Sequence, residues 1–419
     1  MNLHCVITTI AGPTDSVRAL HGELQKAGAR MVVAGDAKGP EVYDLEAVDF
    51  LSLDEQRNGK FRLGRELPTG HYARKNMGYL RAIADGAGCI YETDDDNAPL
   101  PGWKPREELL TDVRLVVSQE EREGREGAER HVDCGPTTDQ GPRTTDRPSW
   151  VNVYKFFTDE NIWPRGLPLD EIHGPDVESS HIAGPVTAEW NVESDTAQTR
   201  VEQEEREERD QEPRTKDHGP RTTDHRPGTK DQLTRRAQRK ASFRAPIQQG
   251  LVNGSPDVDA IWRLTMGRTF EFDQAESVYL APGNWCPFNT QSTWWWPVAY
   301  PLLYVPSYCS FRMCDIWKSF VAQRCLWELN LGVAFHAPEV WQDRNPHDLM
   351  RDFEAEIPGY KRNREFARVL EDLDLKPGEH AIGENLMRCY RALVGAGFFP
   401  EKELDLVEIW LTDLERAFQ

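Results

Sequence analysis

The chain has 419 residues, 38% of them hydrophobic and 29% charged, and carries a formal net charge of -20 at pH 7. This length is sufficient for a large buried core in one domain or in two to three smaller ones. An acidic protein repels the phosphate backbone of nucleic acids, which argues against a nucleic-acid partner. A phosphorylated ligand is then expected to bind through a metal ion or a focused basic patch.

The N-terminal sequence MNLHCVITTIAG has no basic region before its apolar run, so we expect no signal peptide. The most apolar later stretch, 294–306, contains three prolines and is far shorter than the roughly 20 residues of a membrane helix, so we expect no membrane span. The eight cysteines form no CxxC pair, which favours buried thiols in a reducing compartment. These features predict a cytoplasmic protein.

The N-terminal region alternates between apolar, β-branched runs and helical patterns, and each helical pattern ends at a glycine. Strands are predicted at 3–10, 31–36, 48–53 and 88–97, with helices at 16–28 and 71–88. This succession is typical of a mostly parallel, Rossmann-like sheet.

Two segments, 119–149 and 187–240, are rich in charge and in Pro, Thr and Asp, and the second repeats with a period of seven. Neither offers an apolar face of any period, so burial cannot offset the entropy lost on ordering, and we predict disordered insertions. They carry charges of -3 and -1 by count, which leaves about -16 on the rest of the chain.

The remaining chain predicts a strand at 151–157, short strands and loops from 257, and helices at 315–330, 348–373 and near 401–418. The predicted fold class is α/β, a Rossmann-like mixed sheet flanked by helices with a C-terminal helical part. The predicted division of the chain is an α/β part (1–118 and 150–186), two insertions (119–149 and 187–240), a mixed part (241–311) and a helical part (312–419).

Polar side chains follow several of the predicted strands. Thr8 and Thr9 end the first strand, Asp36 ends the second, and the run Asp94-Asp95-Asp96-Asn97 ends the strand at 88–97. Ligands of open α/β sheets bind outside the carboxyl ends of the strands, so these residues are expected to meet at one rim.

Consecutive carboxylates repel one another, and a hard divalent cation such as Mn²⁺ or Mg²⁺ with phosphate oxygens in its shell would compensate them. Asp94 and Asp96 would lie on one side of an extended backbone and share the ion, with Asp95 on the other side. The alternative is an acidic turn that caps the next helix.

Each of the other candidates also has an ordinary structural alternative. The run Arg74-Lys75-Asn76 would bind diphosphate oxygens, or be a basic pair on a helix surface, and Asp36 with Lys38 would bind base or ribose, or form a plain turn. Asp257 and Asp259 would form a second acidic wall or cap a helix, and Asp315 would act as a general base or only favour the dipole of an amphipathic helix. Trp285 and Trp294-Trp295-Trp296 would stack on sugars or pack in the core.

Six segments, IYETDDDN, HYARKNMGYL, VVAGD, NIWPRGLPL, IQQGLVNGSPDVDAIWRLT and FRMCDIWKSFVAQRCLWEL, together resemble the STELLO-type glycosyltransferase family. The resemblance covers nearly the whole chain outside the two insertions. It implies a GT-A-like nucleotide-diphospho-sugar transferase fold in which Asp94 to Asp96 take the position of the DXD motif, which binds a divalent metal and a UDP-sugar. A more distant likeness is to the UDP-arabinopyranose mutase group. Unlike the plant members, this sequence is expected to have no N-terminal tail and membrane anchor, so a Golgi location and a cellulose-synthase partner are not carried over.

The leading hypothesis is a glycosyltransferase that transfers sugar from a UDP-sugar donor to an unknown glycan or small-molecule acceptor. The candidate residues are the metal ligands Asp94 and Asp96, the acceptor-side carboxylates Asp315 and Asp259, and the donor-binding residues Thr8, Thr9, Asp36, Lys38, Arg74, Lys75, Asn76 and Asp95. The alternatives are a nucleotide-sugar mutase acting on the same donor and a non-catalytic scaffold that retains the fold.

Overall fold

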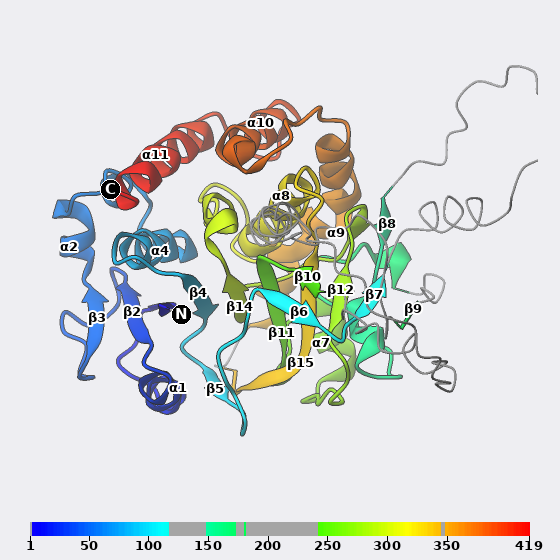
Figure 1. Cartoon of the computed structure of the whole chain (residues 1–419), viewed down its shortest axis with the longest axis horizontal. Coiled ribbons are helices and arrows are strands. Elements are labelled where there is room, and N and C mark those ends of the chain that lie inside the picture. Colours follow the sequence, from blue (N-terminus) through cyan, green and yellow to red (C-terminus); the bar gives the residue numbers. More distant parts are fainter. Residues whose placement is uncertain (1, 117–147, 173–179, 182–241, 345–347) are drawn as a thin grey trace, which may run out of the picture.

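The computed structural model describes residues 2–116, 148–172, 180–181, 242–344 and 348–419. Both predicted disordered insertions lie outside the described residues, except for Pro148 and for Ser149, which belongs to strand β8 (Ser149–Trp150). Within the described part of the chain, the central element is an 11-stranded sheet with the order β3-β2-β1-β4-β14-β11-β15-β12-β7-β9, and β5 pairs with β15 beside this path (Figure 1).

The N-terminal half of the sheet is parallel. Its strands are β1 (Leu3–Thr9), β2 (Arg30–Gly35), β3 (Val48–Leu51) and β4 (Cys89–Thr93). Alternate side chains of β1 enter two cores: Val6 packs with residues of α4 (Lys75–Ala84), whereas Ile7 packs with residues of α1 (Asp15–Lys26). Helices on both faces therefore explain why this strand is apolar throughout.

The other half of the sheet is mixed. It contains β14 (Ser292–Trp295), β11 (Ile247–Gly254), β15 (Val333–Gln342), β12 (Val278–Leu280), β7 (Arg114–Val116), β9 (Ser180–His181) and β5 (Asn97–Pro99). Strand β14 runs antiparallel to both β4 and β11, so this one reversed strand joins the two halves. Two small ladders, β6 (Leu109–Thr111) with β10 (Ser242–Arg244) and β8 with β13 (Asn284–Trp285), complete the strands.

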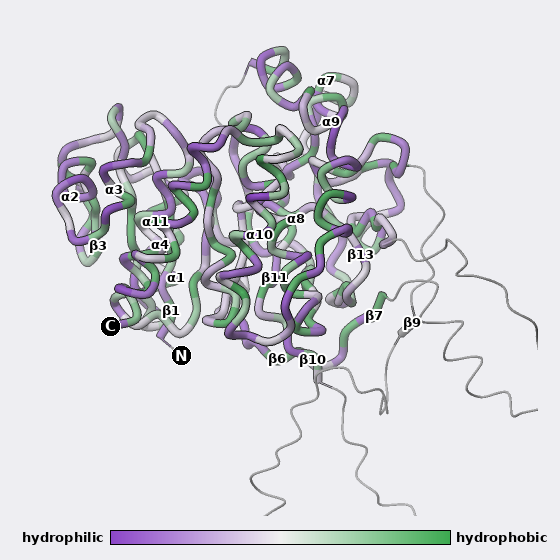
Figure 2. Tube along the Cα trace, turned by 90° about the horizontal axis from the view of Figure 1, so that it is seen from above, coloured by the Kyte–Doolittle hydropathy of each residue, from purple (hydrophilic) through white to green (hydrophobic). Residues whose placement is uncertain are grey.

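The C-terminal helices cover the sheet on the same side as α4 (Figure 1). They are α8 (Cys314–Trp327), α9 (Leu349–Glu371), α10 (Ile382–Gly395) and α11 (Lys402–Ala417). Helix α8 is buried on nearly every side, not amphipathic as predicted, and its Lys318 forms a buried ion pair with Glu92 of β4 at 3.1 Å. On the outer helices green and purple alternate along the chain, as expected when one face packs on a core (Figure 2).

The shorter elements are the helices α2 (Leu53–Asn58), α3 (Leu63–Glu66) and α7 (Ala260–Met266), with the 3-10 turns η1 (Tyr72–Arg74), η2 (Val153–Phe156), η3 (Leu169–Glu171), η4 (Pro297–Leu303) and η5 (Glu379–Ala381). None of the helices in the described ranges is both long and apolar enough to cross a membrane.

The α/β class, the first four strands and the C-terminal helical part are confirmed. The strand predicted at 151–157 is wrong, because residues 153–156 form the 3-10 turn η2. Helix α10 and the central strands β11 and β15 were not predicted. All eight residues of β11 are buried, so its sequence shows no alternation of apolar and polar residues. The strand also contains buried polar side chains, whose hydrogen-bond partners come from other segments and cannot be recognised in the sequence.

Candidate active site

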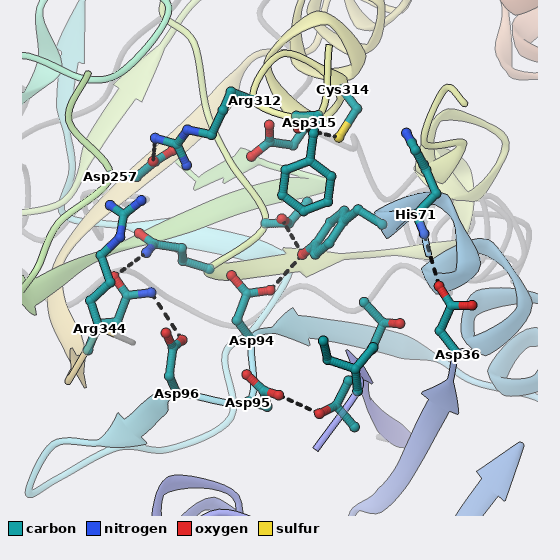
Figure 3. A pocket seen from close by; sticks show the side chains of 18 of the residues that line it. Asp36, His71, Asp94, Asp95, Asp96, Asp257, Arg312, Cys314, Asp315 and Arg344 are labelled. Carbon is teal, nitrogen blue, oxygen red and sulfur yellow. Dashed lines mark hydrogen bonds and ion pairs between the residues drawn. The ribbon is translucent and has the colours of Figure 1, made fainter. Parts of the chain in front are cut away.

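A cleft of about 410 Å³ opens at one edge of the sheet, where β1, β2, β4, β11 and β15 end (Figure 3). Its two sides come from the two halves of the molecule. The N-terminal side is lined by Thr8, Thr9, Ile10, Asp36, Lys38, Gly70, His71, Tyr72, Asp94, Asp95 and Asp96. The C-terminal side is lined by Arg165, Asp257, Thr290, Gln291, Phe311, Arg312, Cys314, Asp315, Gln342 and Arg344. The polar residues predicted at the strand ends thus do meet at one rim.

The three aspartates form a turn, which we call the acidic turn (Asp94–Asp96). Strand β4 ends at Thr93 and β5 begins at Asn97, so the backbone does not stay extended and the predicted alternation of sides is wrong. All three residues line the cleft instead. The next element is a strand, so the alternative of an acidic cap on a following helix does not apply either.

Each carboxylate of the acidic turn has a fixed partner. Asp94 Oδ1 accepts hydrogen bonds from the Tyr72 hydroxyl at 2.6 Å and from Lys75 Nζ at 3.2 Å. Asp95 accepts a hydrogen bond from the Thr9 hydroxyl. Gln342 Nε2 of β15 donates to Asp96 Oδ1 at 3.0 Å.

The acidic turn is short of positive charge. Burial, and then the charge of Asp94, raise the pKa of Asp96 to about 6, and burial raises the pKa of Asp95 despite the hydrogen bond from Thr9. Carboxylates held this way suit a hard divalent cation, which binds oxygen ligands. Among the described residues no three His, Cys, Asp or Glu side chains converge to hold an ion alone. A metal ion bound at this turn would therefore need oxygens of a bound ligand to complete its shell.

The predicted diphosphate run Arg74-Lys75-Asn76 is wholly buried. Arg74 donates to the carbonyl oxygens of Gly64 and Leu67, at 2.7 and 2.6 Å. Asn76 exchanges two hydrogen bonds with the backbone of Val305, at 2.8 and 2.9 Å, so neither side chain reaches the cleft. The diphosphate role is therefore wrong for Arg74 and Asn76, and the alternative of a basic pair on the helix surface is wrong for Arg74 and Lys75.

Lys75 differs from its neighbours because it lies directly behind the acidic turn. Besides Asp94, its ammonium group donates to the Tyr72 hydroxyl at 2.6 Å and to the carbonyl oxygen of Thr93 at 2.7 Å. A buried cation with these partners orients Asp94. It does not line the cleft.

The residues expected to contact the nucleoside lie on the N-terminal side. Asp36 accepts hydrogen bonds from the amides of Ala37 at 2.6 Å and His71 at 2.9 Å, and its carbonyl closes a turn with Gly39 at 2.7 Å. The turn that the sequence left as an alternative is therefore present, and Asp36 still lines the cleft. Lys38 is exposed beside it.

On the C-terminal side Arg165 lies between two carboxylates. Its guanidinium contacts Asp257 at 2.7 Å and Asp315 at 2.6 Å, and all three side chains are at least nine-tenths buried. Burial alone would raise the pKa of Asp257, but the charges of Arg165 and Arg312 outweigh it and lower the pKa to about 2. Asp315 lies in the first turn of α8, as predicted, and also faces the cleft.

Asp259 lies away from the cleft. It caps α7, where its carboxylate accepts hydrogen bonds from the amide of Trp262 at 2.9 Å and from Trp163 Nε1 at 2.7 Å. Of the pair Asp257 and Asp259, which was predicted either to form an acidic wall or to cap a helix, Asp257 belongs to the cleft wall and Asp259 is a helix cap. The predicted catalytic role of Asp259 has no support in its position.

The tryptophans proposed for sugar stacking also lie in the core. Trp285, Trp294, Trp295 and Trp296 are buried, and none of them lines the cleft. Adjacent indoles of β14 enter different cores, because neighbouring side chains of a strand point to opposite faces.

Sequence reasoning missed most of the C-terminal side. The missed residues include the arginine wall (Arg165, Arg312 and Arg344), His71, Tyr72, Gln342 and the exposed Phe311. Arg165 contacts residues 92 and 150 positions away in the chain. Its one signal in the sequence was the segment NIWPRGLPL within the family resemblance.

Residues 312–418 match the family model described as STELLO glycosyltransferases. Over 98% of its length, the chain is 24% identical to "Probable glycosyltransferase STELLO2" and 25% identical to "Probable glycosyltransferase STELLO1", both of Arabidopsis thaliana. It covers 44% of each relative and so spans less than half of their length. These matches confirm the resemblance found in the sequence and relate the chain to the STELLO-type glycosyltransferase family.

Proposed function

We propose that this protein is a metal-dependent glycosyltransferase that uses a nucleotide-diphospho-sugar, a UDP-sugar, as its donor. The observation that carries the proposal is the acidic turn, whose three carboxylates line one cleft at the carboxyl ends of β1, β2 and β4. This edge of an open α/β sheet is where nucleotides bind. The family match and the names of the two relatives support the reaction class.

Different residues of the cleft would bind different parts of the donor. Asp36, Thr8 and Lys38 lie where the nucleoside would bind, and Asp94 and Asp96 would hold Mn²⁺ or Mg²⁺ against the diphosphate. The metal ion would neutralise the diphosphate and stabilise the charge that develops on the departing nucleotide. Lys75 and Tyr72 fix the orientation of Asp94, which a preorganised charge site requires.

Of the two carboxylates predicted to face the acceptor, only Asp315 remains a candidate. It lines the cleft and is ion-paired with Arg165. The alternative of a non-catalytic scaffold would be favoured by aspartates that point away from any cleft, which is the reverse of the arrangement found. Incubating UDP-sugars with and without an acceptor, and looking for ring-form interconversion, separates transfer from the mutase alternative.

Calorimetric titration of the protein with UDP, with and without Mn²⁺, tests the proposal. We expect binding that needs the metal. The cleanest variant is Asp96→Asn, because Asp96 forms no ion pair with any of the described residues, whereas removing Asp94 would also disturb the buried Lys75. Asp44→Asn, at an exposed aspartate outside the cleft, is the matched control. Absence of metal-dependent UDP binding to the unaltered protein would contradict the proposal.

A further inference from the structure

The charges of the C-terminal side of the cleft are balanced by groups of the protein itself. Arg165 is ion-paired with Asp257 and Asp315. Arg312 contacts Glu356 at 2.8 Å and Arg344 contacts Asp352 at 3.0 Å. Each member of the arginine wall therefore already has a carboxylate partner.

The balance is close to neutral. The three arginines of the wall, and a fourth arginine, Arg263, whose charge also lowers the pKa of Asp257, face four carboxylates: Asp257, Asp315, Glu356 and Asp352. An anion that entered here would compete with carboxylates already hydrogen-bonded to the guanidinium groups. A buried guanidinium group of the arginine wall could not move to bind the anion without leaving its own carboxylate partner unpaired. An unpaired charge in a low-dielectric site costs free energy.

Asp257 and Asp315 are the two carboxylates of this set that line the cleft. They come from different segments, the loop after β11 and the first turn of α8, and one guanidinium group holds both in place. A fixed carboxylate has lone pairs left over and accepts hydrogen bonds from hydroxyl groups. Two such carboxylates at fixed positions form a recognition site for a ligand group that carries several hydroxyls.

The cleft offers a separate polar group for each part of a nucleotide-sugar. Figure 3 shows Asp36 on the right, the acidic turn at the lower centre, and Asp257 and Asp315 above the turn, on the C-terminal side of the cleft. A donor whose nucleoside lies by Asp36 and whose diphosphate lies at the acidic turn therefore extends its sugar toward Asp257 and Asp315. This placement rests on the donor binding proposed above.

We infer that the donor sugar is a neutral one, recognised through its hydroxyl groups by Asp257 and Asp315, and that sugar acids are rejected. Arg165 is a positioning residue, which acts by holding the two carboxylates. A carboxylate on the sugar would meet the like charges of Asp257 and Asp315 at close range, beside arginines that are already ion-paired, whereas a hydroxyl would donate to these carboxylates.

Matched pairs of donors test the inference. UDP-glucose and UDP-glucuronic acid differ only in a hydroxymethyl against a carboxylate group, as do UDP-galactose and UDP-galacturonic acid. Calorimetry in the presence of Mg²⁺, with UDP alone as the reference, should show each neutral sugar bound at least about tenfold more tightly than its acid. Equal affinity within both pairs, or tighter binding of the acids, would overturn the inference.

The variant Asp315→Asn sharpens the test, because the amide keeps a hydrogen-bonding oxygen but loses the charge. We expect the preference for the neutral sugar to shrink several-fold while the affinity for UDP, which has no sugar to place there, stays the same. An unchanged preference would count against the role of Asp315, and Asp44→Asn should change neither quantity. Failure of UDP itself to bind the unaltered protein would instead refute the proposed donor site.

Discussion

The two sides of the cleft handle charge in different ways. On the N-terminal side, adjacent carboxylates share one turn, and the one cation that contacts them in the described structure, Lys75, reaches only Asp94. On the C-terminal side, carboxylates and arginines from several segments pair with one another. The first side therefore has negative charge left for a ligand to balance, as proposed above, whereas on the second side the protein's own groups balance one another.

This contrast has an energetic consequence. A site that is short of counter-charge in the free protein stores repulsion, which ligand binding relieves. A site whose charges are already paired stabilises the fold and is damaged when one partner is removed. Neutralising Asp96 on the N-terminal side should therefore stabilise the free protein, whereas neutralising Asp257 on the C-terminal side should destabilise it.

The largest effect is expected from Arg165→Met. Two buried carboxylates, Asp257 and Asp315, would lose their shared cation, and we expect the free energy of unfolding to fall by about 3–5 kcal/mol in urea denaturation. The control is Arg268→Met, which breaks a solvent-exposed pair with Glu160 and should cost no more than about 1 kcal/mol. Similar small losses in both variants would mean that the C-terminal side is not charge-paired as described.

Asp96→Asn should separate binding from stability. We expect metal-dependent UDP binding to weaken at least about tenfold, because one oxygen ligand loses its charge. The melting temperature of the free protein should rise, because a buried like charge is removed. Asp257→Asn should lower it, since that carboxylate is paired. A fall in both melting temperatures would show that the two sides do not differ.

Asp259→Ala tests whether Asp259 is a helix cap and not a catalytic residue. Loss of a helix cap should lower the free energy of unfolding by about 1–2 kcal/mol and leave the affinity for UDP unchanged. Chemical denaturation and calorimetry measure the two quantities on the same preparation. Weakened UDP binding without a loss of stability would show that Asp259 has a functional role in the site.

The smallest effect is expected from Gln342→Leu, which removes the hydrogen bond from β15 to Asp96. A neutral donor to a carboxylate contributes modestly, so the dissociation constant for UDP in Mn²⁺ should rise by about threefold. UDP binding that is abolished outright would show that Gln342 itself contacts the ligand.

The N-terminal side was predictable from the sequence because its signals are local. An apolar strand followed at once by Asp94, Asp95 and Asp96 places carboxylates at a strand end, and parallel strands bring such ends together. What sequence could not supply was the backbone path, since the turn at Asp95 and Asp96 replaces the extended geometry expected there.

The C-terminal side was not predictable, because its partners are far apart in the chain and no periodic pattern marks them. Arg165 lies in a segment rich in proline and glycine, without strand or helix periodicity, and its partners belong to other elements. The prediction for Arg74 and Asn76 was wrong for a different reason. A basic, polar run is usually exposed, and only the packing of α3 and of the loop near Val305 gives these side chains buried backbone partners.

The acidic turn also connects the two halves of the sheet mechanically. It follows β4, which pairs with β1 of the parallel half, and continues into β5, which pairs with β15 of the mixed half. The amide of Asp343 donates to the carbonyl oxygen of Asp96 at 3.3 Å, next to the pair formed by Asn97 and Gln342. A ligand clamped at this turn would restrain both halves at once, so its binding should slow amide hydrogen exchange in β15 as well as in β4 and make the two halves unfold as one cooperative unit.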